Sequence, residues 1–222
     1  VLFEENLDAF AIRVLLARAA TRTLDLQYYI WHADITGMLL ARDLVKAADR
    51  GVKVRLLLDD LNSLDKDASL QALSEHKNIS VRMFNPVQSR QNRITRMVEF
   101  LFRGLSLNRR MHNKACIADG KFAGIGGRNI GGEDIDAGQE NNFVDVDALL
   151  VGEAVEDALE IFNDFWFSGV ARPFKTLLNR RGYTLKDLRK SYEELSEEEQ
   201  MRTKEYLDIV QHHPNIKRLL AR

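Results

Sequence analysis

The sequence contains little cysteine, little proline and no long apolar run. Its single cysteine, Cys116, excludes an internal disulfide framework and does not identify the cellular compartment. No apolar run approaches the ~20 residues that a membrane-spanning helix needs. The formal net charge is −1, so the total charge gives no information on a polyanionic partner, and only the local distribution of charge can.

The remaining composition is that of a globular protein, with 45% hydrophobic residues, 29% charged residues and three prolines among 222 residues. This length fits one large domain better than two. No signal peptide is visible. The chain begins at Val1 and not at a methionine, however, so its natural start is expected to lie upstream.

The hydrophobic pattern alternates between helices and strands. Helices are expected at residues 6–20, 36–50, 65–76 and 153–167, and strands at 23–31, 52–58, 78–84, 113–118, 121–125 and 143–151. Asn6 and Thr36 are the expected N-caps of the first two helices, and Gly51 occupies the αL position after the second. The nearly continuous apolar run 52–58 is typical of a strand buried on both faces. This order predicts an α/β fold, a mixed β-sheet flanked by helices on both faces.

The character of the sequence changes beyond Pro173. Charged, helix-favouring residues dominate from there to the end, and Ser196 with Glu199 fits a capping box. The pattern therefore predicts an α/β lobe over residues 1–172 and a helical C-terminal tail, an arm or linker, over residues 173–222.

His112 and Lys114 are two residues apart in a stretch interpreted as a β-strand. Side chains alternate along a strand, so both are expected on one face. An imidazole is a nucleophile for a phosphate, while an ammonium holds its anionic oxygens and stabilises the charge that develops on them. Short His-x-Lys matches arise by chance, so the pair alone is a weak indication.

Glycines and an asparagine follow the next expected strand, which the turn dipeptide Asp119-Gly120 joins to the first. Gly126 and Gly127 have no Cβ, so a ligand phosphate can approach their backbone closely, and Asn129 can donate an amide hydrogen bond. The alternative interpretation of the glycines is a loop or bulge, and the sequence does not decide between the two.

Taken together, His112-x-Lys114, Asp119 and Gly126-Gly127-x-Asn129 resemble the HKD motif of the phospholipase D superfamily. The sequence is most similar to bacterial cardiolipin synthases of the C type, and the similarity extends over most of residues 1–170. It is carried by the motif and by three further stretches, residues 26–31, 54–60 and 126–131.

The resemblance implies a two-step phosphoryl transfer without a metal or another cofactor. His112 would attack a phosphodiester and form a phosphohistidine, while Lys114 and Asn129 would bind the non-bridging oxygens. Water or a second alcohol would then resolve the intermediate. In the family, a histidine from a second HKD motif protonates the leaving group.

Two acidic positions need separate interpretation. Asp119, the third member of the motif, is at odd parity to His112 and begins the turn, so a structural role is expected for it. Asp145 and Asp147 share one face of the expected strand 143–151. Asp147 is favoured to orient His112, since related enzymes have an acid at a similar point, and a loop-end or solvent-facing acid is the alternative.

The sequence departs from the superfamily pattern in two respects. Gly126-Gly127 stands where many members have Gly-Ser, which removes a hydroxyl contact. No second His-x-Lys exists, because the other histidines are His32, His76, His212 and His213. The chain thus holds half of an HKD site, completed by a second copy or by a second lobe. The missing start and the helical tail favour the N-terminal lobe, which is expected to be monomeric and nearly inactive alone.

A basic stretch precedes the motif. Residues 82–114 contain eight Lys or Arg residues and one acid, Glu99, interleaved with apolar side chains. Arg103, Arg109 and Arg110 are expected to bind anionic headgroups such as phosphatidylglycerol, giving peripheral attachment to a membrane of the bacterial cell envelope. The alternative is a solvated loop whose arginines pair with acids elsewhere.

The leading functional hypothesis is therefore phosphatidyl transfer between phospholipids, namely cardiolipin synthesis. The first alternative is a homodimeric nuclease or phosphodiesterase, in which the basic surface binds a nucleic-acid backbone with steep salt dependence. The second is a lipid-binding lobe that acts only with its partner half. Asp59-Asp60 raises a third, a metal-dependent hydrolase, although no further ligand set is evident.

Overall fold

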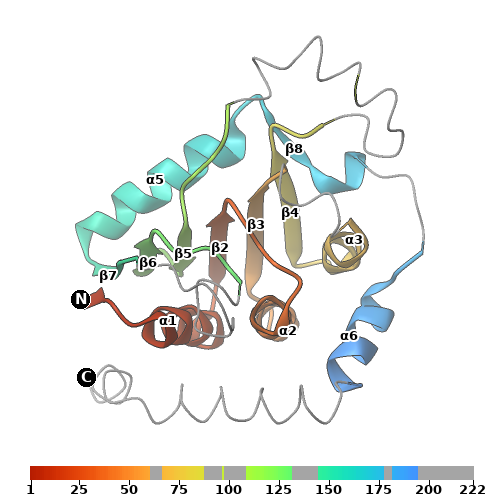
Figure 1. Cartoon of the computed structure of the whole chain (residues 1–222), viewed down its shortest axis with the longest axis horizontal. Helices are drawn as coiled ribbons and strands as arrows, with labels where there is room; N and C mark the ends of the chain where they lie inside the picture. The colour runs from red at the N-terminus through yellow and green to blue at the C-terminus, as the bar shows by residue number, and fades with distance from the viewer. Residues whose placement is uncertain (61–66, 88–96, 98–108, 132–144, 178–181, 195–222) are drawn as a thin grey trace.

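The structure, a computed structural model, describes residues 1–60, 67–87, 97, 109–131, 145–177 and 182–194. Within them one eight-stranded sheet has the order β1-β7-β6-β5-β2-β3-β4-β8 (Figure 1). The strands are β1 (Leu2–Phe3), β2 (Thr23–Tyr28), β3 (Lys53–Asp59), β4 (Ile79–Phe84), β5 (Ala115–Ala118), β6 (Phe122–Gly126), β7 (Asp147–Val151) and β8 (Ala171–Pro173). The central strands β2, β3 and β4 are parallel, and the remaining pairs are antiparallel.

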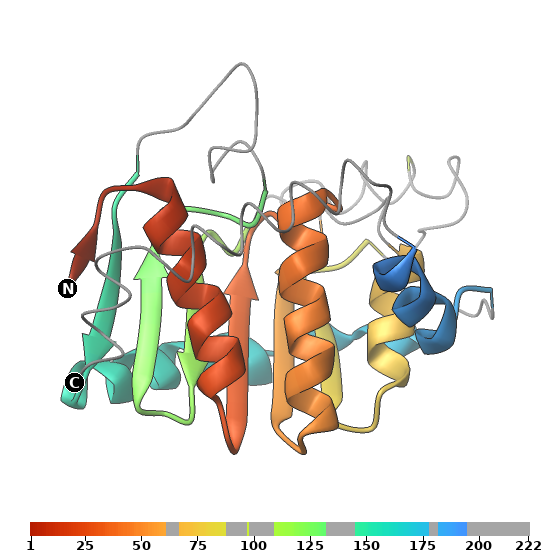
Figure 2. The same ribbon diagram turned by 90° about the horizontal axis from the view of Figure 1, so that it is seen from below.

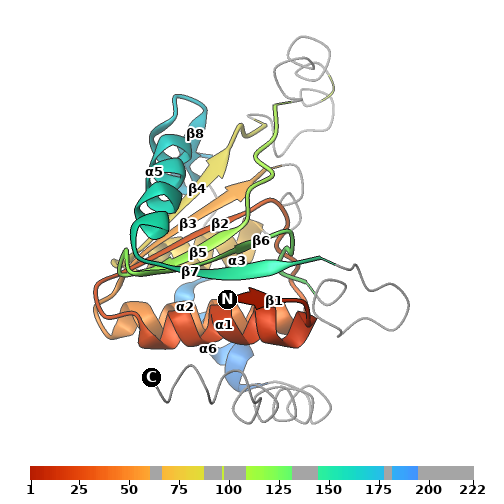
Figure 3. The same ribbon diagram turned by 90° about the vertical axis from the view of Figure 1, so that its left-hand side faces the viewer.

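Helices cover both faces of this sheet, as the sequence predicts. They are α1 (Asn6–Ala19), α2 (Ile35–Asp49), α3 (Asp67–Glu75), α5 (Glu153–Phe167) and α6 (Leu185–Glu193), with a 3₁₀ turn, η2, at Phe174–Thr176. Figure 3 shows α1 and α2 on one face and α5 on the other, and α3 packs on β4 on the side of α1 and α2. The predicted mixed α/β sheet is confirmed.

The two faces of the sheet form two separate hydrophobic cores. In β3, Leu56 and Leu58 belong to the core beneath α1, α2 and α3, whereas Leu57 belongs to the core beneath α5. All three side chains are at most 1% exposed. The apolar run is therefore buried on both faces, as its continuous hydrophobicity predicts.

The helix ends differ from the prediction at two N-caps. Asp34 caps α2 in place of Thr36, because its Oδ1 accepts hydrogen bonds from the Gly37 N–H (3.0 Å) and the Thr36 hydroxyl (2.6 Å). Asn6 does not cap α1, since its side chain accepts a hydrogen bond from Arg128. Gly51 has φ +99, in the left-handed region expected after α2.

The tail is described only as far as residue 194, so Ser196 and Glu199 lie outside the described residues. α6 begins with a capping box that was not predicted, in which the side chains of Thr184 and Asp187 each accept a hydrogen bond from the other residue's backbone N–H. Leu188 of α6 joins the core beneath α2 and α3. The division of the chain at residue 172 stays a prediction.

The sheet brings the motif residues to one edge. β5 is antiparallel to β2, so the residues preceding β5 lie at the carboxyl end of β2, where Gln27 is opposite Ala115. The end of β6 lies at the same edge, because the Gly126 N–H bonds the carbonyl of Lys114 (3.4 Å). Figure 2 shows the arrowheads of β2 and β3 pointing to this edge. Ligand sites of open α/β sheets favour this position.

Candidate functional site

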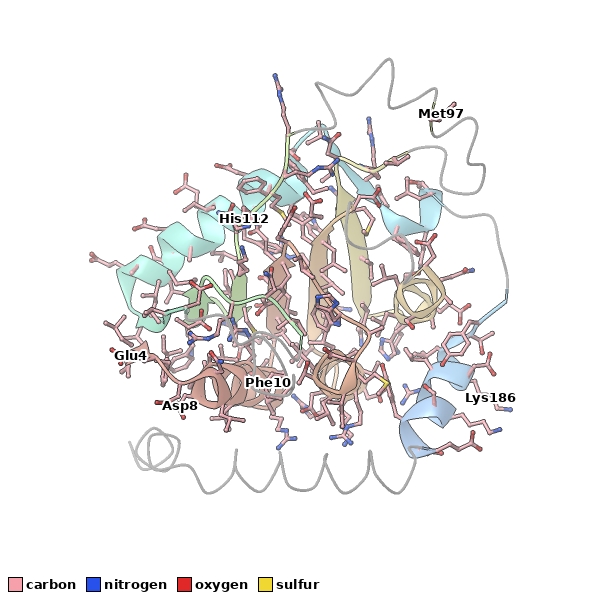
Figure 4. The ribbon with its side chains drawn as sticks, in the orientation of Figure 1. Glu4, Asp8, Phe10, Met97, His112 and Lys186 are labelled. Atoms are coloured by element: carbon pink, nitrogen blue, oxygen red, sulfur yellow. The ribbon has the colours of Figure 1, made fainter. Side chains whose placement is uncertain are left out.

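His112 lies on the irregular segment that leads into β5 (Figure 4). Lys114 lies beside it on the same segment. Lys114 Nζ is 2.9 Å from His112 Nδ1 and donates a hydrogen bond to the His112 carbonyl at 2.7 Å. His112 is exposed, whereas Lys114 is 5% exposed. β5 begins at Ala115, two residues later than the expected strand 113–118, so strand alternation does not place His112 and Lys114 on one face. The lysine side chain reaches the imidazole by bending back toward it.

Met111 and Arg110 fix this segment to the end of β3. The Met111 N–H donates a hydrogen bond to Asp59 Oδ2 at 3.1 Å, and Arg110 Nη1 pairs with Asp59 Oδ1 at 3.2 Å. The Met111 side chain is fully buried beneath α5. A buried carboxylate and a buried thioether thus hold the residue next to His112 in place.

Asp59 and Asp60 therefore act on the backbone around the site. Asp60 Oδ2 accepts a hydrogen bond from the Val87 N–H at 2.9 Å, and both carboxylates are fully buried. In the described parts of the chain, no group of three His, Cys, Asp or Glu side chains lies together as metal ligands would. The contacts favour the structural interpretation of this pair over the metal-dependent hydrolase.

The ring of Tyr29 packs against the imidazole of His112. The two ring centroids are 4.7 Å apart with an interplanar angle of 48°, and Lys114 Nζ is 5.7 Å from the Tyr29 centroid. An aromatic face attracts a nearby cation. Tyr29 lies in the stretch 26–31 that resembles the superfamily, but no local pattern in the sequence marks it as a site residue.

Asn129 is fixed to the residue that follows Tyr29. Its Oδ1 accepts a hydrogen bond from the Ile30 N–H at 3.0 Å, and a backbone bridge joins Ile130 to Trp31. This bond orients the amide so that Nδ2 is the free end, and Nδ2 has no hydrogen-bond partner among the described residues. The side chain can therefore donate to an anion, as the sequence analysis expects.

Gly126 and Gly127 are required by neighbouring carboxylates. A Cβ on Gly126 would overlap the Asp147 side chain, and a Cβ on Gly127 would overlap that of Asp145. These spaces are filled by protein atoms. This is a different reason for glycine from the expected approach of a phosphate to the backbone.

Asp147 has partners other than His112. Its Oδ2 lies 2.8 Å from Arg13 Nη1 and 3.9 Å from Arg128 Nη1, and its Oδ1 accepts from the Arg128 N–H at 3.5 Å. The carboxylate is 4% exposed. The expectation that Asp147 orients His112 is not supported by these contacts, because two arginines already neutralise and bind the carboxylate.

The two arginines connect distant segments behind the glycines. Arg13 Nη2 donates to the Arg128 carbonyl at 3.1 Å, and Arg13 Nε donates to the Tyr28 hydroxyl at 2.9 Å. Arg128 is 1% exposed and binds the Asn6 side chain and the carbonyls of residues 3 and 4. This network fixes the backbone from which Asn129 projects.

Asp119 organises the start of β2. Its carboxylate accepts hydrogen bonds from the N–H groups of Thr21, Arg22 and Thr23 at 2.7–3.2 Å and from the Thr21 hydroxyl at 2.7 Å. Partial burial would raise the pKa of Asp119, but these bonds outweigh it and lower the pKa to about 2. Asp119 and Gly120 both have positive φ, 55 and 63, as a type I′ hairpin turn requires.

The predicted headgroup surface is described only in part. Arg103 lies outside the described residues. Arg110 is half-buried and paired with Asp59, so it belongs to the support of the site, whereas Arg109 is exposed. In the described part of the chain, no helix has the length and apolarity to cross a membrane.

Comparison with known proteins identifies relatives of this fold. The family described as "Cardiolipin synthase, PLD-like domain" matches residues 13–166. Cardiolipin synthase C of Escherichia coli is 44% identical over 176 residues, which are 79% of this chain and 37% of that protein. A cardiolipin synthase of Oceanobacillus iheyensis is 30% identical over 138 residues, 62% of this chain and 26% of that protein. The chain thus spans about a third of the length of these relatives.

Solved structures show the same fold at lower identity. Phosphatidylserine synthase of Haemophilus influenzae has a TM-score of 0.59 at 13% identity, covering 87% of this chain and 42% of that one. NucT of Helicobacter pylori has a TM-score of 0.54 at 19% identity, covering 78% of this chain and 98% of that one. The family match over residues 13–166 and the shared fold agree. The chain therefore belongs to the PLD-like domain family of cardiolipin synthases.

Proposed function

We propose that the chain is the half of a cardiolipin synthase-type phosphatidyltransferase that supplies the nucleophile. The observation that carries this proposal is an exposed imidazole with an ammonium 2.9 Å from it, His112 and Lys114, at the edge of the sheet where the Ile30 N–H orients the amide of Asn129. A nucleophile beside two oxyanion donors is the arrangement that phosphoryl transfer needs. The named cardiolipin synthases among the relatives support phosphatidylglycerol as donor.

In the proposed first step, a neutral imidazole nitrogen of His112 attacks the phosphorus of a phosphodiester. A P–N bond forms, the P–O bond to the leaving alcohol breaks, and the alcohol oxygen takes a proton from a general acid. Lys114 Nζ and Asn129 Nδ2 bind the non-bridging oxygens, on which charge increases. In the second step the deprotonated general acid takes the proton of an acceptor hydroxyl, whose oxygen forms a new P–O bond while the P–N bond breaks and returns the neutral imidazole of His112.

The general acid must come from outside this cluster. Lys114 is engaged with the His112 carbonyl and ring, and the sequence has no second His-x-Lys. We therefore propose that a second HKD lobe, or a second copy of this chain, provides it. The length of the relatives, about three times the matched region, supports the second lobe.

Other residues hold His112, Lys114 and Asn129 in position. Asp59 holds the segment before His112, Tyr29 packs against the imidazole, and Gly126 and Gly127 allow the network behind Asn129 to close. Asp119 and Asp147 act on the scaffold and not on the phosphate. Exposed Arg109 is a candidate contact for anionic lipids, which would place the protein at the surface of a membrane of the cell envelope.

The activity can be tested on this chain and on the full product of its open reading frame. Each is incubated with phosphatidylglycerol and, separately, with single-stranded DNA, and cardiolipin or cut DNA is measured in the presence of EDTA. Cardiolipin formed by the full product and lost in His112→Asn is the expected result. DNA cleavage by a dimer of this chain, with no lipid product, would overturn the proposal in favour of the nuclease.

A further inference from the structure

A cavity of about 240 Å³ lies on the face of the sheet opposite α5. α2, α3 and α6 surround it, and β3 forms its floor. Its walls are dominated by apolar side chains, among them Trp31, Met38, Leu56, Leu58, Leu70 and Leu188. A ligand site of this kind is typically concave, mostly apolar and equipped with a few polar groups.

Several of the lining residues lie toward the edge of the sheet at which His112 lies, whereas Leu56 and Leu73 are deeper along β3 and α3. Trp31 follows the end of β2 and Leu58 is near the end of β3, while Gly37 and Leu70 belong to the first halves of α2 and α3. Parallel β2 and β3 place these positions together beyond or near their carboxyl ends. The cavity is therefore at the same end of the molecule as the proposed phosphate site.

The path between the two places is short. Tyr29 packs on His112, and Ala33 lines the cavity four residues later. At ~3.3–3.6 Å per residue, a backbone of this length spans at most about 14 Å. This separation is within the length of a long hydrocarbon chain attached to a phosphate at His112.

The residues that line the cavity favour an uncharged, apolar ligand. Among the described residues that line the cavity none is charged, and the polar ones are Ser69, Tyr183, Ser191 and Tyr192. The Tyr192 hydroxyl is buried without a hydrogen-bond partner in the described chain. Burial raises the pKa of Tyr192, so this hydroxyl stays neutral and can donate to an ester carbonyl.

We propose that this cavity binds one acyl chain of the phospholipid whose headgroup phosphate lies between His112, Lys114 and Asn129. The proposal rests on the proposed function, since it names the subsite for the apolar part of the same substrate. At roughly 30 Å³ for a group of the size of a water molecule, the cavity of about 240 Å³ holds about eight methylene-sized groups. The rest of a long chain would remain outside the cavity.

Trp31 provides a direct probe of the cavity. A brominated fatty acid quenches tryptophan fluorescence on contact, and the other tryptophan, Trp166, is a buried residue of α5 in the opposite core. Saturable quenching by a brominated long-chain fatty acid is expected for the protein and should be lost in Trp31→Phe. With saturated fatty acids as competitors, affinity should rise about fourfold per added methylene, until about eight are buried.

Two substitutions on α6 distinguish binding of the fatty acid inside the cavity from binding elsewhere on the protein surface. Ser191→Phe fills the cavity from its wall and should weaken probe binding at least tenfold. Lys186→Phe is the matched control, because Lys186 is exposed on the same helix and points away from the body of the protein (Figure 4). It should bind the probe as the natural sequence does. Far-UV circular dichroism and the Tm establish that each variant is folded.

The binding assay needs no turnover, so it separates the two proposals. Absence of saturable quenching, equal binding in Ser191→Phe, or affinity independent of chain length would overturn the cavity assignment, even if phosphatidylglycerol is turned over. Chain-length-dependent binding without any turnover of phospholipid would leave the acyl site standing and count against the proposed function.

Discussion

Replacing Asp147 with asparagine tests the buried network behind the site. Asp147→Asn preserves shape and removes one negative charge from between Arg13 and Arg128. At an effective dielectric constant of about 20, a charge pair at the 2.8 Å separation of Asp147 and Arg13 is worth about 6 kcal/mol before desolvation. Removing one member of a buried pair costs about 3–5 kcal/mol net. Because the amide oxygen still accepts a hydrogen bond, we expect a loss of about 3 kcal/mol.

Urea unfolding measures this loss directly, as a lower midpoint at an unchanged m-value. Asp157→Asn on the exposed surface of α5 is the matched control and should change the free energy of unfolding by less than about 0.5 kcal/mol. A double-mutant cycle with Arg13→Met should give a coupling energy above about 1 kcal/mol. If Asp147→Asn were as stable as the natural sequence yet lost turnover, Asp147 would act on His112 and the network would have been misinterpreted.

Three further changes test other parts of the account. Asp119→Asn should lower the Tm at neutral pH but not near pH 2. The lowered pKa of Asp119, about 2 against an ordinary 3.8, means that its stabilisation is present above pH 4 and is lost as the pH falls toward 2. A Tm difference independent of pH would contradict this. Burial raises the pKa of Cys116 to about 12, so iodoacetamide should modify it only after unfolding, as mass spectrometry can follow, and rapid modification of the folded protein would argue against its burial. Asp59→Asn releases the segment before His112 and should lower kcat about 10- to 100-fold; an unchanged kcat would refute that role.

Local patterns in the sequence were sufficient for most of the fold. Continuous apolar residues identify β3, the Asp119-Gly120 dipeptide identifies the hairpin, and the predicted helix 153–167 has the bounds of α5. Each of these depends on interactions within a few residues or on burial alone. Such information is present in a single sequence.

Contacts between distant residues account for what the sequence did not reveal. Arg13 meets Asp147 across 134 positions, and Arg128 meets Asn6 across 122, so no local pattern indicates either pair. For the same reason, the sequence favours Asp147 to orient His112, and neither interpretation of the glycines, a phosphate approach or a loop or bulge, includes the neighbouring carboxylates. Tyr29 lies in an expected strand rich in aromatic residues, and this pattern indicates a strand but not the contact of Tyr29 with the imidazole of His112.

The central claim is that His112 becomes covalently phosphorylated. A radiolabelled p-nitrophenyl phosphodiester tests it on this chain alone, because nitrophenolate leaves without a proton and so needs no general acid from a second lobe. After an alkaline quench, which preserves phosphohistidine, the account predicts label on His112 with a matching burst of nitrophenolate, and no label in His112→Asn. Nitrophenolate release without label on His112, or equal labelling of His112→Asn, would contradict it.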